Sequence, residues 1–316
     1  MSSTCIIVDG LNLFTRHFIA NPSTNENGES VGGTVGTLGA ICRLAEKFSP
    51  DRMIVVWESG GSPRKRQIYP EYKSSRRPQK LNRYYGDDIP STVQNRNDQI
   101  NTLISILSEL PVIQIYVPDC EADDVIGYIC KYKLEGWRKV IVSSDKDFYQ
   151  LLNKETIIYS PTWKKFVSFK EVREKFSISA ENFCLAKSIC GDSSDNIPGI
   201  KGAGFKTVAK RFPFLESRNF FLISDIITEC TRQIESGSKV KVFKTIIENE
   251  NVIRRNWKLI NLDTNNLSAY QIERILNSID TFEPTRNKMS ILRILKNKSI
   301  KNLDIDRFFL AIKMLG

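Results

Sequence analysis

In residues 1–175, short apolar runs alternate with longer stretches of helical spacing. The short runs are typical of buried strands and fall at 5–8, 52–57, 112–117, 139–142 and 156–159. A further segment, 163–169, could pair with the last of these runs. Apolar residues share one helical face in three longer segments, near 34–48, 98–110 and between Glu121 and Gly136. This alternation predicts an α/β fold with a central, mostly parallel sheet and helices on both faces.

The pattern becomes mostly helical after about residue 175. Helices are predicted over 181–190 and 205–212, with a glycine-rich turn between them, and further helices rich in Lys and Arg follow over 216–316. We therefore expect two regions, an α/β core over 1–175 and a helical region over 176–316.

The charge balance indicates an anionic partner. The chain has 316 residues and a formal net charge of +10, and nucleic acid is the commonest partner of such a surface, ahead of an anionic membrane. No apolar run approaches the roughly 18 residues that span a bilayer. The first residues lack the basic start of a signal peptide, so we expect a soluble cytoplasmic protein without membrane contact.

Cysteine and histidine usage excludes several classes of chemistry. The seven cysteines are scattered without a CxxC pair, which indicates buried thiols in a reducing compartment. His17 is the single histidine, so a histidine-rich metal site is excluded, and no GxSxG motif accompanies it. Carboxylates remain as the groups that can carry a reaction.

Carboxylates gather in and around residues 120–152. Glu121, Asp123 and Asp124 begin one predicted helix, and Asp145 and Asp147 follow the strand 139–142. Parallel strands place such groups at the ligand-binding edge of a sheet, and clustered acids need a cation because they raise each other's pKa. The full set of strand-end and turn acids is Asp9, Glu58, Glu121, Asp123, Asp124, Asp145, Asp147, Asp192 and Asp195. These oxygen ligands suit Mg²⁺ or Mn²⁺, and two such ions are a known arrangement for phosphodiester hydrolysis.

Two other segments indicate contact with nucleic acid. Residues 60–97 interleave Arg and Lys with tyrosines, which is typical either of a solvated loop or of a surface that tracks phosphates and stacks bases. Residues 191–204 form a glycine-rich turn whose backbone amides could bind a phosphate without reading sequence. A purely structural tight turn is the alternative for this second segment.

In combination, these motifs resemble those of the structure-specific 5′ nucleases, a family with a PIN-like α/β core. The matching motifs are IIVDGLNLF, YPEYKSSR, CEADDVIGYI, SSDKDFYQLL and ICGDSSDNIPGIKGAGFKTV, spread over much of residues 4–210. The family includes phage 5′-3′ exonucleases and flap endonucleases, among them phage ribonuclease H, and the nuclease domain of DNA polymerase I. The phage branch is the more similar one, because the chain leaves no room for a polymerase.

The resemblance implies roles for individual residues. Asp9, Glu121 and Asp123, with Asp124 nearby, would hold a first Mg²⁺, and Asp145, Asp147, Asp192 and Asp195 would surround a second, with Mn²⁺ as a substitute. Lys73 and Arg76 would contact the scissile phosphate from a helical arch within 60–97. A helix-hairpin-helix element over 181–212 would grip duplex DNA and could bind K⁺. The nucleic-acid contacts it implies are Arg16, Tyr72, Arg77, Gly199, Lys201, Gly202, Gly204, Lys206 and Lys210.

One position departs from the family pattern, since Glu58 stands where aspartate is usual. The implied activity is 5′-3′ exonuclease and flap endonuclease cleavage of branched or RNA-primed DNA, such as primer removal in replication. A monomer with replication-protein partners, such as a single-strand-binding protein, a clamp or a polymerase, is expected. Two alternatives stay open: a non-catalytic protein that binds branched DNA, and a ribonuclease acting on structured RNA.

Overall fold

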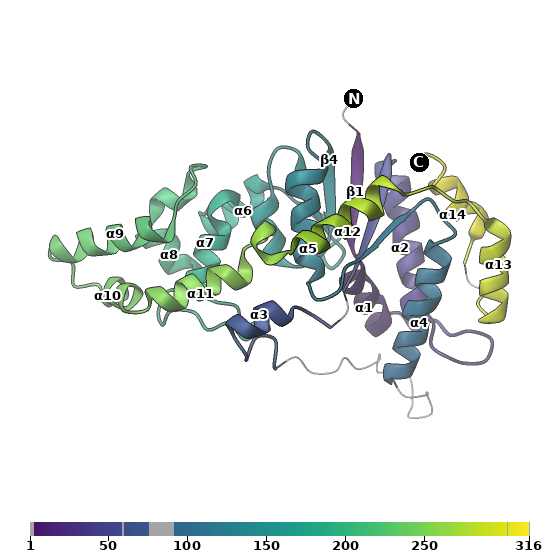
Figure 1. Ribbon diagram of the computed structural model, residues 1–316, viewed down its shortest axis with the longest axis horizontal. Coiled ribbons are helices and arrows are strands. Elements are labelled where there is room, and N and C mark those ends of the chain that lie inside the picture. The colour runs from purple at the N-terminus through teal and green to yellow at the C-terminus, as the bar shows by residue number, and fades with distance from the viewer. Residues whose placement is uncertain (1–2, 59, 76–91, 302, 316) are drawn as a thin grey trace.

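A single six-stranded sheet forms the centre of the protein (Figure 1). The structure is a computed structural model that describes residues 3–58, 60–75, 92–301 and 303–315. The strand order is β3-β2-β1-β4-β5-β6; neighbours are parallel except for β6, which runs antiparallel to β5. The strands are β1 (Thr4–Asp9), β2 (Arg52–Trp57), β3 (Ile113–Tyr116), β4 (Arg138–Val142), β5 (Thr156–Ser160) and β6 (Lys165–Val167). The predicted mostly parallel sheet is confirmed.

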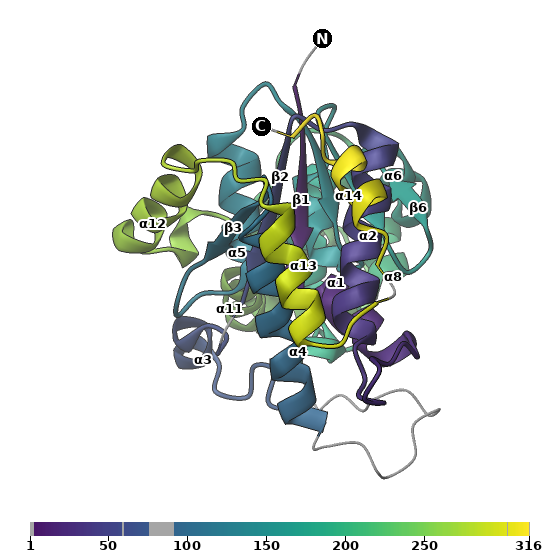
Figure 2. The same cartoon turned by 90° about the vertical axis from the view of Figure 1, so that its right-hand side faces the viewer.

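Helices cover both faces of the sheet, because successive side chains of its buried strands point to opposite sides. Ile6 and Val8 of β1 face one core, and Cys5 and Ile7 face the other. The first core is covered by α1 (Gly10–Ala20), α2 (Gly32–Phe48), α4 (Thr92–Leu107), α13 (Lys288–Asn297) and α14 (Ile305–Ala311) (Figure 2). The second is covered by α5 (Ala122–Tyr128) and α12 (Ala269–Asp280).

Two helices of the α/β core were not predicted, and a third extends further toward the N-terminus than predicted. Helix α1 was not predicted; it begins directly after β1 because Asp9 accepts the backbone N–H of Asn12 as an N-cap. Helix α4 is already helical at Thr92, where the described residues resume, rather than from near residue 98. Polar residues fill its first turns, so they carry no apolar pattern that could have predicted it. A short helix, α3 (Pro63–Ile68), lies where no core helix was predicted, capped by the Ser62 side chain.

A helical extension lies to one side of the sheet in Figure 1 and has an apolar core of its own. Its helices are α6 (Phe169–Phe176), α7 (Ala180–Cys190), α8 (Phe205–Arg211), α9 (Ile223–Glu235), α10 (Lys241–Glu248) and α11 (Glu250–Ile260). Beyond this extension, α12, α13 and α14 return to the sheet, so the end of the chain contributes to the α/β core. Within the described residues, every helix is too short or too polar to span a bilayer.

The parallel strands bring distant acids to one edge. Val8 pairs with Val55 and with Val142, so β1, β2 and β4 end at a similar height. Asp9 is the last residue of β1, and Glu58 and Asp145 follow the ends of β2 and β4, which places all three at the carboxyl edge of the sheet.

Candidate metal centre and nucleic-acid interface

The carboxyl edge borders a cavity of 820 Å³ that is lined by acids from four parts of the chain. Asp9 comes from the end of β1, Glu58 from the end of β2, Glu121 and Asp123 from the start of α5, and Asp145 from the loop after β4. Basic residues line the same cavity, namely Arg66, Lys73 and Arg96. The cavity therefore combines a group of carboxylates with positively charged side chains that can bind a phosphate.

Three of these acids, Asp9, Asp123 and Asp145, form no ion pair with the described lysines and arginines. Asp9 is held by Asn12 N–H at 3.1 Å and by the Ser143 hydroxyl at 3.1 Å. Burial, with the charges of Asp145 and Glu58, raises the pKa of Asp9 to about 7. Burial, Asp145 and Asp9 raise the pKa of Asp123 well above its ordinary value, although the charge of Lys73 acts in the opposite direction. Hard carboxylate oxygens without an ion-pair partner among the described residues are the donor set that a divalent ion fits.

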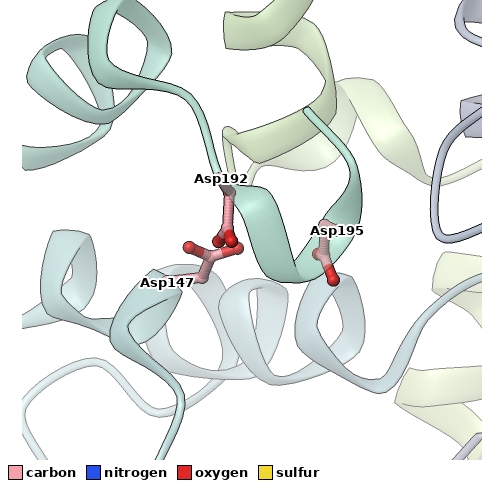
Figure 3. Close-up of side chains that lie close together, drawn as sticks. All are labelled: Asp147, Asp192 and Asp195. Carbon is pink, nitrogen blue, oxygen red and sulfur yellow. The ribbon is translucent and has the colours of Figure 1, made fainter. Parts of the chain in front are cut away.

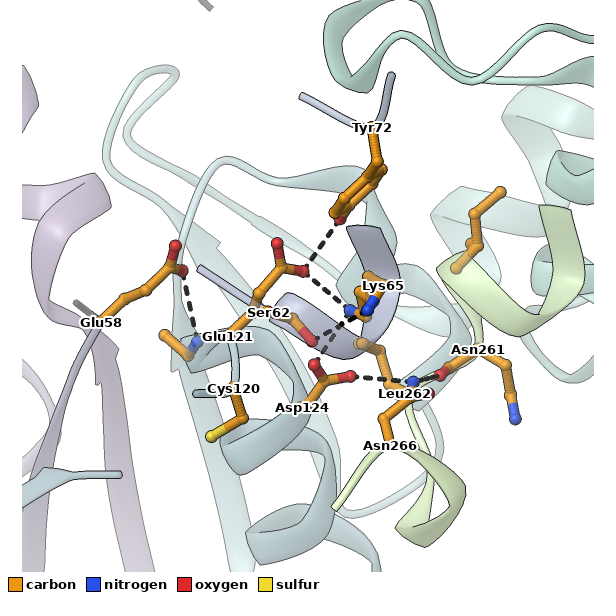
Figure 4. Close-up of polar contacts among 12 residues, drawn as sticks. Glu58, Ser62, Lys65, Tyr72, Cys120, Glu121, Asp124, Asn261, Leu262 and Asn266 are labelled. Atoms are coloured by element: carbon orange, nitrogen blue, oxygen red, sulfur yellow. Dashed lines mark hydrogen bonds and ion pairs between the residues drawn. The ribbon is translucent and has the colours of Figure 1, made fainter. Parts of the chain in front are cut away.

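Glu121 and Asp124 converge on one buried lysine, as their i, i+3 spacing predicts (Figure 4). Lys65 Nζ lies 2.7 Å from Glu121 Oε2 and 2.9 Å from Asp124 Oδ2, and Asn266 donates to the other Asp124 oxygen. Burial alone would lower the pKa of Lys65, but both carboxylates raise it, so the lysine stays charged. Asp124 is fully buried beneath this contact and does not line the cavity.

Glu121 also anchors the segment after α3. Lys73 Nζ lies 2.5 Å from Glu121 Oε1, and the Tyr72 hydroxyl donates to Glu121 Oε2 at 2.9 Å. Burial would raise the pKa of Glu121, but Lys65 and Lys73 lower it to about 2. The Tyr72 ring is 5% exposed and packs with Cys184 and residues 259–260, so it cannot stack on a base in this arrangement.

Asp147, Asp192 and Asp195 form a second group, in which one carboxylate oxygen of each lies within 4.8 Å of the others (Figure 3). Lys187 of α7 pairs with Asp147 and lies 2.5 Å from Asp192 Oδ2. Burial opposes ionisation of Asp192, but Lys187 and the Ser194 donors lower its pKa. This group can therefore hold a cation, and in the structure the ammonium of Lys187 serves as one.

The predicted acids thus fall into three sets. The cavity contains Asp9, Glu58, Glu121, Asp123 and Asp145; the group around Lys187 contains Asp147, Asp192 and Asp195; and Asp124 lies beneath Lys65. Sequence reasoning missed Lys65, Lys187, Asn12 and Ser143. A signal existed for Lys187, which is a lone charge in the apolar run FCLAKSIC.

The predicted nucleic-acid contacts are spread over several surfaces. Arg16 donates to Thr162 Oγ1 at 2.9 Å near the acidic edge. Lys201, Lys206 and Lys210 are exposed around the glycine-rich turn and α8. The turn has a structural reason for Gly199, because a Cβ there would lie 1.9 Å from the carbonyl oxygen of Cys190, while Gly202 has φ +81° and Gly204 has open space beside it. Arg76 and Arg77 lie outside the described residues.

The parallel sheet and its acidic carboxyl edge define an α/β protein with a site suited to divalent ions. The sequence pattern of the family described as 5′-3′ exonuclease, N-terminal resolvase-like domain, matches residues 4–177, more than half of the chain. The chain belongs to the 5′-3′ exonuclease family.

Curated relatives include nucleases of similar length and parts of larger enzymes. The flap endonuclease Xni of Shewanella sp. strain MR-4 is 28% identical over 82% of this chain and 90% of its own. The 5′-3′ exonuclease of Buchnera aphidicola subsp. Schizaphis graminum is 31% identical over 64% of this chain and 67% of its own. Against DNA polymerase I of Deinococcus radiodurans, at 31% identity, the chain spans 20% of the relative's length.

Solved structures show the same fold. The bacteriophage T5 D15 protein, crystallised with metal ions, is 20% identical with a TM-score of 0.65 and covers 96% of this chain and 99% of its own. The D15 flap endonuclease in a complex with DNA and metal ions matches with the same TM-score. The fold of this protein is therefore that of the T5 5′-exonuclease.

Proposed function

We propose that this protein is a divalent-metal-dependent, structure-specific 5′ nuclease with 5′-3′ exonuclease and flap endonuclease activity. Its substrate would be branched or RNA-primed DNA with a 5′ end, as in primer removal during replication. The observation that carries this proposal is the group Asp9, Asp123 and Asp145, which forms no ion pair with the described lysines and arginines and shares one cavity with Lys73. The family and its flap-endonuclease relatives support the reaction class.

In this proposal, each of the two acid groups holds one metal ion. Mg²⁺, or Mn²⁺ in its place, would be held by Asp9, Asp123 and Asp145, with Glu58 and Glu121 beside them, and a second ion by the group around Lys187. Such ions activate water and stabilise the charge that develops on a phosphodiester. Asp124 would act by positioning Lys65, because its contacts are with Lys65 and Asn266 rather than with the cavity.

Lys73 is the basic residue best placed to meet the scissile phosphate. It lies at the cavity wall, and its backbone N–H donates to the Asp195 carbonyl oxygen at 2.9 Å, which fixes its position relative to the second acid group. A cation fixed in this way can bind a non-bridging phosphate oxygen and oppose the charge formed during cleavage. Arg66 and Arg96 would hold neighbouring phosphates along the same cavity.

The DNA complexes of structural neighbours support a DNA substrate. Exposed Lys201, Lys206 and Lys210 would contact the duplex backbone around the glycine-rich turn. A helix-hairpin-helix role for residues 181–212, K⁺ binding there, phosphate contacts from Arg76 and Arg77, a monomeric state and replication-protein partners stay predictions.

The test is cleavage of a 5′-labelled flap and of an RNA-primed duplex in Mg²⁺, with products sized at nucleotide resolution. The wild type should release short 5′ products, and an Asp145→Asn/Asp147→Asn double variant should not. Absence of cleavage by the wild type, with Mn²⁺ titration showing no divalent site, would favour a DNA-binding protein instead. Preferential cleavage of structured RNA over flap DNA would favour the ribonuclease.

Lys73→Ala separates catalysis from binding. We expect a larger loss in single-turnover cleavage rate than in flap affinity, because the lysine acts on the phosphate at the reacting centre. Equal losses in both quantities would show that Lys73 only binds the substrate.

A further inference from the structure

The turn between β5 and β6 lies beside the acidic edge. Strand β5 runs parallel to β4, with Tyr159 opposite Val142, so the chain leaves β5 at the same edge of the sheet as Asp145. The hydroxyl oxygens of Ser144 and Thr162 are 2.7 Å apart, and Arg16 also donates to Thr162. The hydrogen bond of Thr162 therefore links this turn to Ser144, the residue directly before Asp145.

The tip of this turn presents an aromatic ring surrounded by cations. Trp163 is 48% exposed, although a tryptophan would normally bury most of its surface. Lys165 and Lys175 place their ammonium groups 5.6 and 5.7 Å from its ring centroid. Lys164, beside it, has a left-handed backbone with φ +52°, a strained conformation for a non-glycine residue at the turn.

A structural role explains this arrangement poorly. Among the described residues, Trp163 belongs to none of the buried apolar clusters, and the ammonium groups of Lys165 and Lys175 lie near its ring. An exposed indole with adjacent cations has the chemistry of a stacking platform for a nucleobase, with the cations available for the flanking phosphates.

We propose that residues 161–165 form a further nucleic-acid contact, in which Trp163 stacks on a terminal or unpaired base next to the cleavage site. Lys164 and Lys165 bind the phosphates on either side of that base. The contact rests on the proposed function, because it uses the same substrate bound at the acidic cavity. Stacking does not distinguish the four bases, so it would favour branched or end-containing DNA over continuous duplex without sequence preference.

The first test is binding of a fluorescein-labelled 5′ flap to the full-length protein, measured by anisotropy in Ca²⁺ to prevent cleavage. Trp163→Ala should weaken binding about tenfold, which is within the range for loss of one stacked base, and Trp163→Phe should retain most of the affinity. Tyr270→Ala is the matched control. Tyr270 is 58% exposed, and its ring centroid lies 5.8 Å from the guanidinium of Arg274. It is on α12, however, which contacts β3, the outermost strand on the other side of the sheet from β6.

A scan of abasic sites through the flap junction identifies the stacked base. One abasic position should weaken wild-type binding and leave Trp163→Ala unaffected, since the base and the ring contribute the same interaction. Unchanged affinity of Trp163→Ala, or a loss that no abasic position reproduces, would overturn the proposal while the wild type still cleaves flaps. If the wild type neither binds nor cleaves flaps, the proposed function fails, and this contact fails with it.

Discussion

Two groups of carboxylates lie near the carboxyl edge of the sheet, and they differ in what neutralises them. Asp9, Asp123 and Asp145 have no partner lysine or arginine in the described parts of the chain, and the pKa values of Asp9 and Asp123 are raised. Asp147 and Asp192 share the ammonium group of Lys187, which lowers the pKa of Asp192.

The difference shows how one fold can hold two acidic sites before any ion binds. A buried ion pair is compensated within the chain, so the group around Lys187 can remain assembled without metal. The cavity group has no ion-pair partner among the described residues, and its carboxylates repel each other, so it gains most from an added divalent ion. We therefore expect metal binding to stabilise the cavity group strongly, and to compete with Lys187 for the other group.

The largest expected effect is on cleavage by Asp145→Asn. The cavity group would lose a charged oxygen needed to hold an ion, and ionic stabilisation of a phosphodiester transition state amounts to several kcal/mol. The cleavage rate should therefore fall by roughly 10³-fold or more. Single-turnover flap cleavage measures the rate, and circular dichroism checks the fold. Asp306→Asn, on the exposed start of α14, is the control; a similar loss in both variants would contradict a metal role.

The substitution Lys187→Met tests the second carboxylate group, which Lys187 neutralises. It keeps the apolar stem but removes the cation, which leaves the buried Asp147 and the half-buried Asp192 next to each other without compensation. Without metal, we expect a loss of about 3 kcal/mol in the free energy of unfolding. Added Mn²⁺ should restore more stability than it gives the wild type. Chemical denaturation with and without Mn²⁺ measures both values.

The control for Lys187→Met is Lys244→Met, which removes an exposed i, i+4 partner of Glu248 on α10. That change should cost no more than about 0.5 kcal/mol and should be insensitive to Mn²⁺. If Mn²⁺ stabilises Lys187→Met no more than the wild type, Lys187 does not compete with an ion.

The raised pKa of Asp9 predicts a pH effect on stability without metal. Its pKa is about 7 in the folded protein and 3.8 in the unfolded reference, so the folded state binds the proton more tightly. Stability from this group is therefore present below pH 4 and lost as the pH rises through 7. Asp9→Asn should be more stable than the wild type at pH 8, by on the order of 2 kcal/mol, and equally stable near pH 4. The difference is smaller than the pKa shift of Asp9 alone would give, because the cavity acids titrate together. Denaturation in EDTA across this range measures it, and a less stable variant at pH 8 would contradict it.

The sequence predicted the sheet and the position of its acids because both follow from short-range patterns. Apolar runs ending in carboxylates identify parallel strands, and their common edge gathers Asp9, Glu58 and Asp145 without knowledge of the loops. Helix α1 escaped prediction because its first turn, after Asp9, continues directly from the strand, so no polar loop marks the boundary.

Pairing between distant side chains could not be predicted in the same way. Lys65 reaches Glu121 and Asp124 across 56 residues of sequence or more, and Lys187 reaches Asp147 across 40. Such pairs depend on how α3 and α7 pack, which a single sequence does not encode in local spacing. The burial of Tyr72 has the same origin, because its cover comes from α7 and α11.

The smallest expected effect tests how the cavity group is held in place. Asn12 receives the Ser144 backbone N–H on its side-chain oxygen at 3.3 Å, and its own N–H donates to Asp9, so it joins two strand ends that carry acids. Asn12→Ala should lower Mn²⁺ affinity about tenfold, as expected for a residue that orients ligands, with a stability loss of about 1 kcal/mol. Calorimetric titration of Mn²⁺ measures the affinity.

Asn153→Ala separates orientation of ligands from stability alone. The Asn153 side chain accepts the backbone N–H groups of Glu155 and Thr156 at 2.8 Å, which is a similar turn, but it precedes β5 and so lies at the edge opposite the acids. It should lose similar stability and keep wild-type Mn²⁺ affinity, because no cavity acid depends on it. An equal loss of Mn²⁺ affinity in Asn12→Ala and Asn153→Ala would mean that the acids respond to a general loss of stability in the sheet. The difference between the two carboxylate groups would then not depend on local geometry.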